Sequence, residues 1–349
     1  MSLAAEDTVV TKNIWYMLAY AYRALDVVDY ARIKTEDFEN LDDLLSAILA
    51  AGLDAQRMRG FERDYIEIEE DIPGVRGKID LEGTPQHKLQ RRALTRCAYD
   101  DYRADTLKNR ILKTTAMAML RSDEVRHETK TSLKKNLMLM RDVKLVDPSG
   151  IEWRRLNYHR NNRSYELLMG VCYLTLNRQL PAQENGGIHF ASFLDNQKLH
   201  ALYEKFVLEY FRRHHPHLRA SAKEIPRGAS ENAPSFLPKL QTDITLASNE
   251  QTLIIDTKCY GKILRGNAFG NEILSPSHLN QILSYVMHER YESAKKVSGM
   301  LLYALTDRDE VRHEHWREIG IDLYCYTLDL GRDFKEIASQ LDEIAGLVG

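Results

Sequence analysis

Residues 239–258 read KLQTDITLASNEQTLIIDTK, two runs that alternate apolar and polar side chains around a Ser-Asn-Glu turn. Side chains of a strand point alternately to its two faces, so Asp256 and Lys258 share one face while Thr257 points to the other. Asp243 lies on the polar face of the first run. The pattern therefore predicts a β-hairpin that gathers two acids and one lysine on one face.

The length of the turn decides whether the two acids meet. A two-residue turn at Asn249-Glu250 places Asp243 directly opposite Asp256, with Cβ atoms about 4.5–5.5 Å apart. A longer loop would make the pair diagonal. Two carboxylates this close repel each other unless one is protonated or a cation bridges them.

A pair of carboxylates beside a lysine suits metal-assisted hydrolysis of a phosphodiester. Carboxylate oxygens are ligands that Mg²⁺ prefers, and the backbone carbonyl of Thr257 is a candidate further ligand. The ion would polarise the phosphate and lower the pKa of an attacking water, while Lys258 would position or deprotonate that water. The alternative is a hairpin in which Asp256 and Lys258 form only a surface salt bridge.

Helical patterns on both sides of the hairpin carry further polar residues. The preceding helix has Glu204 and Glu209 near the margins of its apolar stripe, where one of them could reach the same metal ion. The following helix has Gln281 and Tyr285 four residues apart, hence on one face. The expected order is helix, strand, strand and helix, and it carries Asp, Asp-x-Lys and Gln-x-x-x-Tyr. This combination resembles the PD-(D/E)xK nuclease superfamily and its RecB-like members. The proline that this pattern places before its first Asp is replaced here by Thr242.

Length and linkers divide the 349-residue chain into two expected domains. The boundary is the Pro- and Gly-containing segment 180–187, which gives domains 1–185 and 186–349. The first is expected to be an α+β domain with a small antiparallel β unit at about 62–101, and the second an α/β domain with a mixed sheet flanked by helices. The expected helices are 13–25, 41–58, 105–121, 125–140, 164–178, 198–212, 276–290 and 333–347, and the expected C-terminal strands are 239–247, 251–259, 297–304 and 320–327.

Composition excludes several classes of protein. No apolar run is long enough to span a membrane, and residues 1–11 do not resemble a signal peptide. The four cysteines stand far apart, which argues against a zinc site or a disulfide framework and fits a reducing cytoplasm. The net charge is −3, but residues 212–227 are locally basic. This stretch is interpreted either as a phosphate-binding surface or as a solvated helix end.

A more extensive likeness joins the two halves. The chain resembles the McrC family, the endonuclease subunits of modified-cytosine restriction systems, in the same order over nearly its full length. The segments that carry the likeness are NIWYMLAYA (13–21), PGVRGKI (73–79), NRILK (109–113), LYEKF (202–206), LPKLQTDI (237–244) and IIDTK (254–258). Because Glu204 lies in the matched segment LYEKF, the resemblance implies that Glu204, rather than Glu209, assists the metal.

The resemblance implies a division of labour with McrB, an AAA+ GTPase hexamer that recognises modified cytosine in double-stranded DNA. McrC subunits dock into the pore of that ring through their N-terminal region, stimulate GTP hydrolysis and supply the nuclease. The sequence agrees, because it has no GxxxxGK[ST] motif: Gly77-Lys78 and Gly261-Lys262 are each followed by isoleucine. GTP is therefore expected to bind the partner.

The β unit at about 62–101 is the candidate for the part that enters the pore. Arg76 and Lys78 are the candidate partner-binding residues, with Arg91, Arg92 and Arg96 beside them; ordinary solvated charge is the alternative for each. Two other functions stay open for the chain. One is a regulatory scaffold with a degenerate nuclease fold, and the other is a self-sufficient RecB-like or resolvase-type nuclease.

Overall fold

The computed structural model divides into two compact units, which are Met1–Leu41 with Glu184–Gly349, and Asp42–Gln183. It describes residues 3–38, 40–80, 94–160, 162–178, 197–225, 239–259, 263–266, 272–305 and 311–348. The expected domain boundary at 185, in the segment 180–187, lies outside the described residues. A second division near residue 41 was not expected, since the first 41 residues group with the C-terminal part of the chain.

The described part of the unit Asp42–Gln183 contains the helices α3 (Leu41–Arg59), α5 (Leu107–Met119), α6 (His127–Leu139) and α7 (Tyr165–Arg178). The apolar side predicted for α3 is fully buried, as its residues Leu44, Leu45, Ile48 and Leu49 show. Thr106 caps α5 by accepting a hydrogen bond from the backbone N–H of Asn109. Helix α5 packs against α6 and α7. Two 3₁₀ turns, Pro148–Gly150 and Trp153–Arg155, precede α7.

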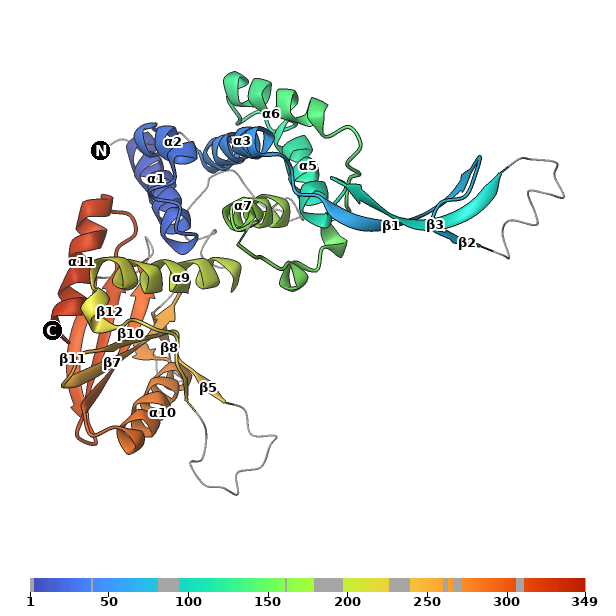
Figure 1. The fold of residues 1–349 in the computed structure, drawn as a ribbon. Helices are drawn as coiled ribbons and strands as arrows, with labels where there is room; N and C mark the ends of the chain where they lie inside the picture. The colour runs from blue at the N-terminus through green and yellow to red at the C-terminus, as the bar shows by residue number, and fades with distance from the viewer. Residues whose placement is uncertain are drawn as a thin grey trace. The chain divides into compact units, whose positions relative to one another are not determined.

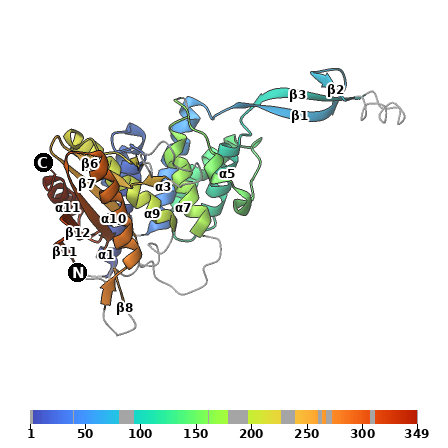
Figure 2. The ribbon, with the colours of Figure 1, turned by 90° about the horizontal axis from the view of Figure 1, so that it is seen from below.

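Three antiparallel strands of the same unit form what we call the β arm: β1 (Asp64–Ile72), β2 (Lys78–Ile79) and β3 (Thr95–Arg103). β3 lies between β1 and β2, and the arm extends away from the helices of its unit (Figures 1 and 2). Gly77 has φ +65°, and a Cβ there would lie 2.4 Å from the Ala98 carbonyl oxygen, so the turn requires glycine. The expected β unit is confirmed where it is described; Arg91 and Arg92 lie outside the described residues.

The other unit contains the expected mixed sheet, in the order β11-β12-β10-β7-β6. β7 (Gln251–Lys258), β10 (Lys296–Ala304) and β12 (Ile321–Leu328) are parallel, while β6 (Ile244–Ala247) and β11 (His313–Glu318) pair antiparallel at the two edges. β11 was not predicted, because its sequence HEHWRE lacks an apolar alternation.

Helices cover this sheet on opposite sides (Figure 1). One side carries α10 (Pro276–Glu292), whose Ile282 and Val286 belong to one core cluster with Ile254 and Leu301. The approach is close, because a Cβ on Gly299 would lie 2.7 Å from Ile282 Cγ1. The other side carries α9 (Gln197–His214), against which α11 (Phe334–Gly346) packs.

The N-terminal helix α1 (Leu3–Ala21) packs against α9, which explains why the first 41 residues belong to this unit. The buried Asn13 donates hydrogen bonds to the carbonyl oxygens of Leu330 at 2.8 Å and Arg332 at 2.7 Å. Tyr20 lies against Phe206 and Phe334. A 3₁₀ turn (Val28–Tyr30) and α2 (Ala31–Thr35) follow α1.

The expected continuous strand 239–247 is wrong in one respect, because it is interrupted at Thr242 and Asp243. β5 (Leu240–Gln241) pairs with β4 (Glu224–Ile225), whereas β6 pairs with β7. Thr242 donates its backbone N–H to the Lys223 carbonyl at 2.9 Å, and its hydroxyl accepts from the Lys223 N–H at 3.0 Å. These bonds to a distant loop bend the chain just before Asp243.

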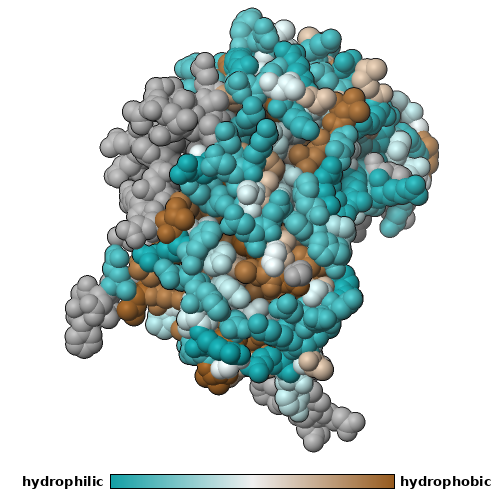
Figure 3. Space-filling view, turned by 90° about the vertical axis from the view of Figure 1, so that its left-hand side faces the viewer, coloured by the Kyte–Doolittle hydropathy of each residue, from teal (hydrophilic) through white to brown (hydrophobic). Residues whose placement is uncertain are grey.

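The remaining short elements of this unit are the 3₁₀ turn Pro216–Leu218 and the antiparallel pair β8 (Leu264–Gly266) and β9 (Glu272–Leu274). The face of the molecule in Figure 3 is mainly hydrophilic, with hydrophobic residues in small patches. Among the described residues, no helix combines the length and the apolar character that a membrane span needs.

Candidate active site

The hairpin of β6 and β7 has the predicted register. Ile244 pairs with Ile255, and Ser248 donates its backbone N–H to the Gln251 carbonyl at 2.9 Å across the Asn249-Glu250 turn. The two-residue turn is therefore confirmed. One further step along this register places Asp243 at the position opposite Asp256, just outside the end of β6.

The Asp243 side chain is directed to Thr257. Asp243 Oδ2 accepts a hydrogen bond from the Thr257 backbone N–H at 2.7 Å and another from its hydroxyl at 2.8 Å. The expectation that the Thr257 side chain points away from both acids is therefore wrong for Asp243. The physical reason is the bend at Thr242, which takes Asp243 out of strand alternation. The two bonds fix one carboxylate oxygen at the end of β7.

Asp256 and Lys258 form a buried pair. Their side-chain atoms Oδ2 and Nζ are 2.6 Å apart, and the residues are 0% and 5% exposed. Their burial rules out a solvent-exposed surface salt bridge. Neither carboxylate oxygen of Asp256 accepts a hydrogen bond of good geometry in the described structure. The pKa of Asp256 is raised to about 6, because burial and, to a smaller extent, the charge of Asp243 outweigh the opposing effect of Lys258.

Helix α10 brings the two predicted polar residues to this pair. Lys258 Nζ donates to Gln281 Oε1 at 3.2 Å, and Gln281 Nε2 donates to the Tyr285 hydroxyl at 2.8 Å. Burial raises the pKa of Tyr285, so this hydroxyl stays protonated at neutral pH. The chain Asp256–Lys258–Gln281–Tyr285 thus leaves the lysine ammonium little freedom to move.

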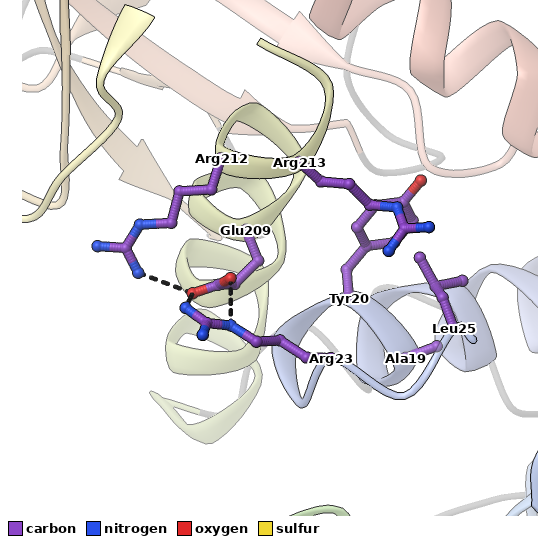
Figure 4. Close-up of a pocket in the computed structure, with 7 residues that line it drawn as sticks. All are labelled: Ala19, Tyr20, Arg23, Leu25, Glu209, Arg212 and Arg213. Carbon is purple, nitrogen blue, oxygen red and sulfur yellow. Dashed lines mark hydrogen bonds and ion pairs between the residues drawn. The ribbon is translucent and has the colours of Figure 1, made fainter. Parts of the chain in front are cut away.

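The two glutamates of α9 have different surroundings. Burial, together with the negative charges of Asp243 and Asp256 and against the charge of Lys258, raises the pKa of Glu204 to about 7. Glu204 is therefore close enough to the site to sense its charges. Glu209 instead accepts hydrogen bonds from Arg23 at 2.8 and 3.0 Å and from Arg212 at 2.7 Å. Figure 4 shows this network beside a cavity of about 330 Å³ between α1 and α9.

Arg23 and Arg212 hold the pKa of Glu209 below its usual range, although burial by itself would raise it. A carboxylate that carries two guanidinium partners is engaged in joining α1 to α9. The geometry therefore favours Glu204 over Glu209 as the acid that faces the candidate site.

His200 is a site residue that the sequence reasoning missed. Its Nε2 lies 2.8 Å from the Thr257 carbonyl oxygen, the predicted metal ligand. The signal was present, because His200 precedes Glu204 by four residues on α9 and so shares its face. A carbonyl oxygen has two lone pairs, so the contact with His200 leaves one for another partner.

The residues present fit a hard divalent cation. The buried Asp256 oxygens have no hydrogen-bond donor of good geometry. Burial raises the pKa values of Asp256 and Glu204, and the charge of Asp243 adds to the shift of both. Within the described ranges, no three His, Cys, Asp or Glu side chains converge as a metal-ligand group. Mg²⁺ matches this sparse set, because it commonly keeps several waters and binds through one or two carboxylates.

The candidate partner-binding residues lie on the β arm. The Arg76 guanidinium is 4.0 Å from the centroid of the Tyr99 ring and 3.1 Å from Asp101 Oδ1. Lys78 is exposed on β2. Arg96 pairs with Glu69 and Asp80, each at 3.5 Å. Arg76 is therefore held in one orientation on the surface of the arm.

Cations of the basic stretch 212–227 pair with acids of the same unit. Arg212 pairs with Glu209 and Arg213 with Asp26, both at 2.7 Å, and Lys223 Nζ lies 2.5 Å from Glu289 Oε2. Arg219 donates to the Ala247 and Ser248 carbonyls. Arg227 lies outside the described residues. These contacts favour a structural role for the stretch.

Comparisons with known proteins match most of the chain. The family model for McrBC 5-methylcytosine restriction system components matches residues 3–304. The chain is 28% identical over 343 residues to the type IV methyl-directed restriction enzyme EcoKMcrBC of Escherichia coli K12, covering 97% of this chain and 98% of that protein.

Two solved structures are similar at low identity. One is a chain of the half-complex from a tetradecameric assembly of Thermococcus gammatolerans McrB AAA+ hexamers with bound McrC, at 15% identity, TM-score 0.47, and 96% and 76% coverage of this chain and that chain. The other is a chain of the Thermococcus gammatolerans McrBC complex, at 17% identity, TM-score 0.39, and 60% and 59% coverage.

Proposed function

The chain belongs to the family of McrBC 5-methylcytosine restriction system components, and we propose that it is the DNA-cleaving subunit of such a system. The proposed activity is Mg²⁺-dependent hydrolysis of DNA phosphodiesters by a PD-(D/E)xK-type domain. The observation that carries it is the buried Asp256, whose oxygens lack a hydrogen-bond donor of good geometry although Lys258 Nζ lies 2.6 Å away. Burying an ion pair is costly unless further ligands or hydrogen bonds satisfy the remaining lone pairs of the carboxylate.

Asp243, Asp256 and the Thr257 carbonyl would hold Mg²⁺, with Glu204 assisting. The bound ion would polarise the scissile phosphate and acidify a water molecule. The chain's own residues organise the rest. Thr257 fixes one oxygen of Asp243, so that its other oxygen is left for a ligand.

Lys258 is the proposed catalytic cation. Gln281 orients its ammonium group, and the Tyr285 hydroxyl accepts from the Gln281 amide. An ammonium held in this way would position the attacking water and stabilise negative charge as it develops on the phosphate, without first having to reorganise.

The proposed partner is a McrB-like AAA+ GTPase hexamer that binds GTP and recognises modified cytosine in double-stranded DNA. The names of the similar proteins support this, since they describe a methyl-directed restriction enzyme and McrB hexamers with bound McrC. The β arm, with Arg76 and Lys78, is the proposed contact with that ring and the element that stimulates its GTP hydrolysis. A cytoplasmic location follows from the same role.

Reconstitution tests the function and separates it from the alternatives. Plasmid DNA containing 5-methylcytosine is incubated with this chain, a McrB-like partner, Mg²⁺ and GTP, and each component is omitted in turn. We expect double-strand breaks only in the complete mixture, and faster GTP hydrolysis when the chain is present. Stimulation without any strand break would favour a regulatory scaffold. Cleavage by the chain and Mg²⁺ alone would favour a self-sufficient nuclease.

A further inference from the structure

One asparagine of α5 holds both ends of the β arm. Asn109 Nδ2 donates to the carbonyl oxygen of Glu62, just before β1, at 2.8 Å, and to that of Ala104, just after β3, at 2.7 Å. A single amide group therefore ties together the two points where the arm leaves the helices. Asn109 is 0% exposed, so water does not compete for these bonds.

The oxygen of the same amide completes a closed network. Asn109 Oδ1 accepts a hydrogen bond from the Tyr165 hydroxyl at 2.8 Å, and that hydroxyl accepts from the Glu62 backbone N–H at 2.8 Å. Both peptide groups of Glu62 are thereby bound to side chains of α5 and α7. Buried networks in which each group has a partner confer rigidity, because breaking one bond leaves another polar group unsatisfied.

The Glu62 side chain strengthens the same attachment. Its carboxylate accepts from Lys108 at 3.0 Å and from Asn162 at 2.6 Å. Lys108, Asn162 and Tyr165 therefore all bind Glu62, in the segment between α3 and β1. We call Glu62, Asn109 and Tyr165 the base clamp.

Apolar packing contributes little at this place. Of the described strand residues nearest the base, 64–66 and 101–103, none is buried. A cavity of about 340 Å³, partly lined by Glu62, Tyr102 and Tyr165, lies beside the base. Hydrogen bonds, rather than side-chain packing, are therefore what sets the direction of the arm relative to α5 and α7.

We infer that Asn109 is a positioning residue that mounts the β arm rigidly on the helices of its unit. It bridges the two strand ends, and Tyr165 holds its amide in the required orientation. A rigid mount transmits a force or displacement applied to the arm, whereas a loose hinge absorbs it. The clamp is thus the element that connects a partner on the arm to the helical body.

Distance measurements on the full chain test the inference directly. Spin labels at Glu67→Cys on the arm and Lys134→Cys on α6 report the arm direction by double electron–electron resonance. The four native cysteines are buried, so labelling is selective. In the parent protein we expect one narrow distance distribution. In Asn109→Ala and in Tyr165→Phe the distribution should broaden or shift. Tyr165→Phe removes only one oxygen atom.

Asn136→Ala is the matched control. Asn136 is also a fully buried asparagine of the same unit, but its amide donates to Asp54 and Ser132 and not to the arm. Asn136→Ala should keep the narrow distance. The inference is overturned if both clamp variants give the parent distribution, or if Asn136→Ala broadens it as much as they do.

A second readout rests on the proposed function. With a saturating McrB-like GTPase, Asn109→Ala should still bind the partner, but its stimulation of GTP hydrolysis should fall by about tenfold. That factor lies in the usual range of coupling between two sites. Full stimulation by a chain whose arm is demonstrably loose would refute the coupling. Failure of the parent chain to stimulate would instead refute the proposed function, while the distance distributions would still decide whether the clamp exists.

Discussion

Lys258 Nζ lies 2.6 Å from Asp256 Oδ2, and this pair is buried at the end of a parallel strand where no described donor satisfies the carboxylate with good hydrogen-bond geometry. A buried pair of this kind is weak support for stability by itself. The proposed Mg²⁺ would add positive charge to this arrangement and ligate the carboxylate. The proposals for Asp243, Glu204 and Gln281 follow from that reading.

Magnesium binding should depend on pH. The folded chain without metal holds Asp256 at a pKa of about 6 and Glu204 at about 7, against ordinary values of 3.8 and 4.5. The folded state therefore binds more protons than the unfolded state between the ordinary and the raised pKa values, so the stability of the metal-free chain falls as pH rises from about 4 to about 7. Mg²⁺ needs the charged carboxylates, so its apparent affinity should rise over the same interval.

Thermal unfolding with and without Mg²⁺ at about pH 5.5 and 8 checks this linkage. We expect the increase in Tm on adding Mg²⁺ to be larger at the higher pH. The double variant Asp256→Asn/Glu204→Gln serves as control and should lose the pH dependence of that increase. An equal increase at both pH values in the parent chain would contradict the assignment.

Glu204 and Glu209 should give opposite results when each is changed to glutamine. Glu204→Gln should weaken Mg²⁺ binding and cleavage with little effect on stability. Glu209→Gln should lower the free energy of unfolding by about 1–2 kcal/mol, a value reduced for the exposure of its arginine partners, and leave Mg²⁺ affinity unchanged. Chemical denaturation and metal titration of both variants measure the two effects. Weaker Mg²⁺ binding in Glu209→Gln alone would reverse their roles.

Gln281→Ala should slow DNA cleavage by releasing Lys258. The loss of one orienting bond is expected to cost about tenfold to a hundredfold in rate, since misplacement of a catalytic group is costly. Tyr285→Phe acts one bond further away and should have the smaller effect. Single-turnover cleavage with the partner present measures the rates. A larger loss in Tyr285→Phe than in Gln281→Ala would show that Tyr285 acts on the substrate directly.

Arg76→Ala should weaken stimulation of the partner's GTPase and, with it, DNA cleavage. Arg103→Ala is the comparison variant, because Arg103 pairs with the same carboxylate as Arg76, at 2.6 Å from Asp101 Oδ2, and so reports the effect of removing an arginine partner of Asp101 without removing Arg76. Lys78→Ala tests the second candidate partner-binding residue in the same assay. Stimulation is measured as the rate of GTP hydrolysis at saturating chain. Equal losses in Arg76→Ala and Arg103→Ala would indicate a general effect on the arm.

Local pattern was sufficient to predict the hairpin. Strand alternation and the Asn249-Glu250 turn predicted the register that Ile244 and Ile255 adopt, and helical spacing predicted that Gln281 and Tyr285 share a face. The bend before Asp243 could not be predicted in this way, because it depends on hydrogen bonds between Thr242 and Lys223.

Long-range packing explains the other differences. The N-terminal helix belongs to the C-terminal unit because Asn13 binds the Leu330 carbonyl and Arg23 binds Glu209, contacts between residues far apart in sequence. The ion-paired surroundings that distinguish Glu209 from Glu204 likewise depend on the packing of α1 against α9, which local sequence patterns do not predict.

The most direct test of the central claim is to separate cleavage from GTPase stimulation in Asp256→Asn. This variant removes one charge at nearly constant volume, beside a lysine that stays in place. With a McrB-like partner, GTP, Mg²⁺ and DNA containing 5-methylcytosine, we expect cleavage to fall by about a thousandfold or more while GTP hydrolysis is stimulated as by the parent chain. Parent-like cleavage by Asp256→Asn, or loss of stimulation together with cleavage, would contradict the account.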